Sequence, residues 1–65
     1  MPKRYLADAF IRHYGAERAA VIAKQYADSC TVAGDQAGRI RWTSVAELIA
    51  EEIEKDRTAA EIVNE

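Results

Sequence analysis

Two side chains in this sequence could act together as a nucleophile and its base. His13 is the only histidine and Cys30 the only cysteine, and a Cys–His pair can perform nucleophilic catalysis when the two side chains meet in a pocket. Their spacing does not favour such a meeting, and a chain of 65 residues is too short to build a pocket around them. Zinc sites need three or four ligands of these types. We therefore expect no catalytic residue, metal site or cofactor, with His13 exposed at a helix end and Cys30 buried as a small apolar side chain.

Carboxylates crowd the second half of the chain. Residues 1–32 carry five basic and three acidic side chains, whereas residues 33–65 carry four basic and eight acidic ones. Paired carboxylates can hold a divalent cation or act as acid and base, but here they alternate with apolar residues, as on the solvated face of a helix. The alternative is that this acidic end meets a basic partner surface. The acidic candidates for partner binding are Glu47, Glu51 and Glu54.

A basic pair precedes the single tryptophan. Arg39 and Arg41 could contact phosphate or an acidic partner, with Trp42 stacking beside them, and we include both arginines among the candidate partner-binding residues. This part of the chain is similar to a DNA-binding helix–turn–helix. It has a predicted helix, a turn at residues 33–35 and a second helix that begins with these arginines. The acidic sequence after Arg41 and the net charge of -2 argue against nucleic acid as the partner. We expect Trp42 to face the core instead.

The elements that position these side chains are predicted to be helices over about residues 3–14, 16–32 and 36–56. In the first, Leu6, Phe10 and Tyr14 follow at steps of four, and Gly15 is a predicted left-handed cap. The second presents a narrow face of mostly small residues, so another helix can approach it closely. Residues 57–65 are a tail that could form a further short helix, because Thr58-Ala59-Ala60-Glu61 has the form of a capping box.

The junction before the third helix has the clearest punctuation. Gly34 supplies the backbone freedom to leave a helix, and Asp35 is a good N-cap for the next. A second start signal competes, because Ser44-Val45-Ala46-Glu47 is also a capping box. On that alternative the helix would begin only at Ser44; we prefer the longer helix, whose apolar stripe includes Trp42.

Residues 33–45 resemble a pattern found in short uncharacterised bacterial proteins, A-G-D-x-x-G-x-x-x-W-x-x-I. The matching residues are Gly34, Asp35, Gly38 and Trp42, with Val45 in the place of Ile. The similarity covers residues 13 to about 50, and the family is a domain of unknown function, so the resemblance implies a helical hairpin and no activity. Within this motif, Gly34 and Gly38 would let the start of the third helix lie against the end of the second.

The sequence thus predicts a single all-α domain of three helices, with the second and third as an antiparallel hairpin. We expect a cytoplasmic, non-enzymatic protein without a membrane segment, which binds another protein or a second copy of itself as an adaptor, inhibitor or regulator. Phages and mobile elements encode compact acidic proteins of this kind. The alternative is a helix–turn–helix DNA-binding regulator. The predicted core is Leu6, Phe10, Ile22, Tyr26, Trp42, Val45, Ile49 and Ile53.

Overall fold

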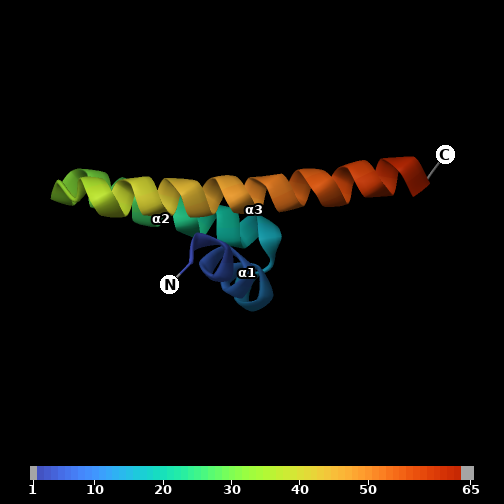
Figure 1. Ribbon diagram of the computed structural model, residues 1–65, viewed down its shortest axis with the longest axis horizontal. Coiled ribbons are helices and arrows are strands. Elements are labelled where there is room, and N and C mark those ends of the chain that lie inside the picture. Colours follow the sequence, from blue (N-terminus) through green and yellow to red (C-terminus); the bar gives the residue numbers. More distant parts are fainter. Residues whose placement is uncertain (1, 64–65) are drawn as a thin grey trace.

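The computed structural model describes residues 2–63, with side chains through residue 60, and all of its regular structure is helical. Helix α1 spans Lys3–Tyr14, α2 spans Ala16–Ala33 and α3 spans Gln36–Val63. Helices α2 and α3 run antiparallel, side by side, and α1 packs beneath the N-terminal half of α2 and the middle of α3 (Figure 1). The predicted all-α class and the hairpin of the second and third helices are confirmed.

The turn between α2 and α3 provides hydrogen-bond partners for free backbone groups at both helix ends. Gly34 adopts a left-handed conformation with φ 77° and ψ 16°. The Gly34 N–H donates to the Thr31 carbonyl at 3.2 Å, and the Asp35 N–H donates to the Cys30 carbonyl at 2.8 Å, which is the bonding pattern of a Schellman motif. The Asp35 Oδ1 then accepts a hydrogen bond from the Gly38 N–H at 2.9 Å. Asp35 is therefore the N-cap of α3, as predicted.

The two glycines of this turn have different physical roles. A Cβ on Gly34 would meet no atom within 4 Å, so Gly34 is required by its positive φ rather than by packing. A Cβ on Gly38 would stand 2.8 Å from the Cys30 Sγ and would also strike the Asp35 carboxylate. The prediction that both glycines let the helices approach is therefore right for Gly38 and wrong for Gly34.

Gly15 alone joins α1 to α2. Its φ of 86° and ψ of 153° place it in a region open essentially to glycine alone, which corrects the predicted left-handed cap. Its N–H donates to the Ile11 carbonyl at 2.8 Å, and its carbonyl accepts from the Ala19 N–H at 2.9 Å. One residue therefore ends the first helix, starts the second and reverses the direction of the chain.

The core is built mainly from alanines rather than from the large residues that periodicity selected. The residues that are buried are Ala7, Ala19, Ala23, Ala27, Val45 and Ile49. Of the other predicted core residues, Leu6, Phe10, Ile22, Trp42 and Ile53 are half-buried. Tyr26 is 45% exposed and Cys30 is half-buried, which corrects both predictions. Small side chains at the centre let the helix axes approach, so the larger side chains form a rim around them.

Helix α3 is longer than predicted at its C-terminal end and passes uninterrupted through both capping-box patterns. Helix α3 already begins at Gln36, and the Ser44 hydroxyl donates to the Ile40 carbonyl at 3.0 Å within the helix, so the alternative start at Ser44 is wrong. The helix also continues beyond residue 56 to Val63, so no separate short helix forms over residues 57–63. Residues 64–65 of the predicted tail lie outside the described residues.

The C-terminal part of α3 extends beyond the other helices. The molecule measures 48 × 19 × 16 Å, and α3 defines its long axis (Figure 1). At 1.5 Å per residue α3 is about 42 Å long and α2 about 27 Å. Since every described side chain from Glu54 to Ala60 is exposed, we call residues 54–63 the overhang. No described helix is long and apolar enough to cross a lipid bilayer.

Candidate functional site

The acidic candidates lie on the outer face of α3. Glu47, Glu51 and Glu54 are all exposed, and their spacing of four and then three residues places them on one side of a helix. The buried residues Val45 and Ile49 belong to the opposite side, since a residue advances by 100° around the helix. The structure therefore brings the three carboxylates together as an acidic stripe. The stripe begins at Glu47, where α3 runs beside α2, and ends at Glu54 in the overhang.

The carboxylates of this stripe differ in their ion pairing. Arg57 Nη2 lies 3.4 Å from Glu54 Oε1, one turn along the overhang. Within the described part of the chain, Glu47 and Glu51 have no ion-pair partner. A shallow hollow where the overhang begins is lined by Glu51, Glu54, Lys55, Thr58 and Ala59. Glu47 and Glu51 thus present two carboxylates to solvent without a described ion-pair partner.

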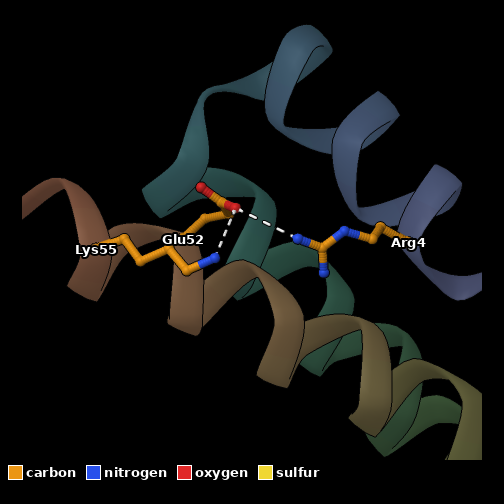
Figure 2. Close-up of polar contacts among 3 residues, drawn as sticks. All are labelled: Arg4, Glu52 and Lys55. Carbon is orange, nitrogen blue, oxygen red and sulfur yellow. Dashed lines mark ion pairs between the residues drawn. The ribbon is translucent and has the colours of Figure 1, made fainter.

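Glu52 makes a contact that sequence reasoning missed. Its Oε1 lies 3.8 Å from Arg4 Nη2 on α1 and 3.9 Å from Lys55 Nζ on α3 (Figure 2). Lys55 follows Glu52 by three residues, so that pair could be found from spacing alone. The contact with Arg4 depends on where α1 crosses α3, which no local pattern gives. Glu52 therefore acts as an ionic link between helices and not as part of the acidic stripe.

The basic candidates do not form one patch. Arg39 and Arg41 are both exposed, but two residues along a helix are separated by about 200° around its axis. Arg39 lines a hollow at the α2–α3 turn together with Cys30, Thr31, Gly34, Asp35 and Gln36. The Asp35 carboxylate in this hollow already caps α3. The two arginines consequently lie on different sides of α3.

Aromatic rings join the three helices at the edge of the core. The Phe10 ring of α1 lies 5.5 Å from the Trp42 ring of α3 and 6.2 Å from the Tyr26 ring of α2, measured between centroids. The Tyr26 and Trp42 rings are 4.8 Å apart. Trp42 thus covers the seam between α2 and α3 as predicted, with Tyr26 as its neighbour. Such ring pairs add about 0.5–1.5 kcal/mol beyond the area they bury.

His13 and Cys30 take separate positions. The His13 ring packs edge-on against Tyr14 at 4.6 Å, at the junction of α1 and α2. Cys30 lies near the far end of α2, about 20 Å along that helix by its rise per residue, beside Gly38. Among the described residues, no three His, Cys, Asp or Glu side chains are arranged to hold a metal ion.

Comparison with family models, curated proteins and solved structures gave no match. The resemblance to the bacterial pattern at residues 33–45 therefore stays a prediction. Support for a function therefore comes from the geometry of the acidic stripe and of α3, the helix that carries it.

Proposed function

We propose that this chain is a non-enzymatic protein-binding module whose acidic stripe, Glu47, Glu51 and Glu54, binds a basic surface of another protein. The observation that supports this most is the placement of these carboxylates on the outer face of a helix that extends past its neighbours. The core does not use that face. A partner could therefore bind it without disturbing the fold.

Electrostatics favours association over chemistry at this surface. Glu47 and Glu51 are exposed and without ion pairs in the described part of the chain, so their charge acts on a partner within about 8 Å at physiological ionic strength. Complementary charge raises association rates and selects partners more than it adds affinity. A role as adaptor, inhibitor or regulator, including one encoded by a phage or mobile element, requires only such recognition.

The test compares the tagged chain with two variants of equal charge. Glu47→Gln/Glu51→Gln/Glu54→Gln removes the acidic stripe. Asp8→Asn/Glu17→Gln/Asp28→Asn removes the same charge from exposed positions on α1 and α2. We expect the unmodified chain and the α1/α2 variant to retain the same basic protein from lysate at low salt, and the stripe variant to lose it. Equal retention by both variants, or no retained partner at all, would overturn the proposal.

A further inference from the structure

Helix α1 is attached to the rest of the fold by an unusually simple connection. Its link to α2 is Gly15 alone, whose N–H bonds to the Ile11 carbonyl and whose carbonyl receives the Ala19 N–H. Both hydrogen bonds join residues four apart, as in a continuous α-helix. The reversal of the chain therefore depends on one φ, ψ pair, 86° and 153°.

Residues on both sides of Gly15 are compatible with a continuous helix. No proline lies between Lys3 and Ala33. If Gly15 took helical angles, residues 3–33 would form a single helix, and the N–H groups at the start of α2 would gain helical partners. The closed and extended forms thus differ mainly at one glycine, which adopts either conformation without a side-chain penalty.

In the extended form α1 could not pack on Val45 and Ile49 of its own chain. Ala7 and Ala23, which are both buried in the closed form, would be sixteen residues apart on one helix and about 160° apart around its axis. The apolar side of α1 would then face away from the α2–α3 hairpin. The surface that α1 leaves behind includes Val45 and Ile49, and it would be open to solvent.

We propose that α1 is an exchangeable element, and that two copies of this chain form a dimer in which each α1 packs on the hairpin of the other. The partner fits because the exposed α1 of one copy and the uncovered hairpin of the other make the same contacts as the closed monomer. Those contacts include Ala7 against the core and the Arg4–Glu52 ion pair shown in Figure 2. Reciprocal exchange gives a closed two-fold dimer, and it is independent of the acidic stripe.

The balance between monomer and dimer is set by concentration and by Gly15. The contacts within the closed monomer are re-formed between the two copies of the dimer. The free energies of the dimer and of two closed monomers therefore differ in two terms: the entropy of association, which opposes the dimer, and the helical hydrogen bonds gained near Gly15, which favour it. Short connections under conformational constraint favour this kind of exchange. A residue that disfavours the bend at position 15 will therefore shift the population toward the dimer.

The first experiment measures mass by light scattering after size exclusion for the unmodified chain, Gly15→Ala and Glu17→Ala. Alanine disfavours the φ of Gly15 and strongly favours helix, so we expect Gly15→Ala to be dimeric at concentrations where the unmodified chain is monomeric. Glu17→Ala raises helix propensity beside the junction and leaves Gly15 intact, so it should behave as the unmodified chain. A folded, monomeric Gly15→Ala protein would overturn the proposal.

A second experiment keeps Gly15 and tests exchange directly. Arg4→Glu and Glu52→Arg each place like charges between α1 and α3 within one chain. Only in an exchanged heterodimer of the two variants does each α1 meet a hairpin of opposite charge, at both interfaces. After joint unfolding and refolding at high concentration, native mass spectrometry should show heterodimer well above the half expected for random pairing of dimers. Monomers alone, or a random distribution of dimers, would refute the exchange.

Discussion

Gly38 of α3 lies against Cys30 of α2 so closely that a methyl group at position 38 would stand 2.8 Å from the Cys30 Sγ. The same methyl group would strike the Asp35 carboxylate, which caps α3 through the Gly38 N–H. One glycine therefore permits both the close approach of α3 to Cys30 of α2 and the cap that begins α3. A small and a larger substitution at position 38 should therefore differ in how much stability they cost.

Gly38→Val should lower the free energy of unfolding by about 1–3 kcal/mol, the usual cost of overpacking. Gly38→Ala should change it much less. Alanine gains about 1 kcal/mol of helix propensity over glycine, which offsets the loss of the cap and the displacement of the flexible Cys30 side chain. Urea denaturation followed by circular dichroism measures both values. Equal stability of the valine variant and the unmodified protein would contradict the close packing described here.

Asp35→Ala should destabilise the protein by about 1 kcal/mol, the typical loss for an N-cap. The hydrogen bond from the Gly38 N–H to Asp35 Oδ1 would be lost, while Asp35→Asn retains an acceptor oxygen and should lose far less. Both variants remove the same negative charge. The difference in stability between Asp35→Ala and Asp35→Asn therefore isolates the hydrogen bond of the cap. If asparagine proved as damaging as alanine in urea denaturation, the charge rather than the hydrogen bond would be responsible.

The residues that end and cap helices predicted most of the fold. Gly34 and Asp35 specify the turn through backbone conformation and a side-chain cap, both of which act within a few residues. The end of α3 was mispredicted because Thr58 and its neighbours imitate a helix start, whereas no glycine or proline after Gly38 ends the helix. A capping-box pattern does not start a new helix when no residue before it ends the preceding helix.

The core and the site were predicted less completely, for a different reason. Hydrophobic periodicity favours large side chains, and it selected Tyr26, which is 45% exposed. The residues with least exposure include Ala19 and Ala23, because small side chains decide where helix axes meet. The exposed acidic stripe followed from helical spacing alone. The contact of Glu52 with Arg4 needed the crossing of α1 over α3, which arises only from tertiary packing.

Trp42→Ala should cost about 2–3 kcal/mol, less than the ~3–5 kcal/mol of a fully buried tryptophan, since Trp42 is only half-buried. Trp42→Phe keeps a ring against Phe10 and Tyr26 and should retain most of that stability. As the only tryptophan, Trp42 also reports its own environment: its emission should shift toward longer wavelength on unfolding in urea. An emission maximum that is the same in folded and unfolded protein would show that the indole is not packed as described.

Glycine substitutions should separate the overhang from the cooperative fold. Ala50, Ala59 and Ala60 are all exposed on α3, so glycine at each removes similar helix propensity and little packing. Ala50 lies where α3 runs beside α2, and Ala50→Gly should lower the free energy of global unfolding by about 1 kcal/mol.

Ala59→Gly/Ala60→Gly, in contrast, should reduce the helical circular dichroism signal and leave the urea midpoint nearly unchanged. The reason is that helix without tertiary packing is only marginally stable in water, so the overhang can lose helix while the three-helix core stays folded. Amide hydrogen exchange provides the second measurement: residues 57–60 should exchange faster than residues 45–49 in the unmodified chain. A midpoint that fell as far for the double variant as for Ala50→Gly would mean that the overhang unfolds together with the core and is supported by contacts beyond its own helix.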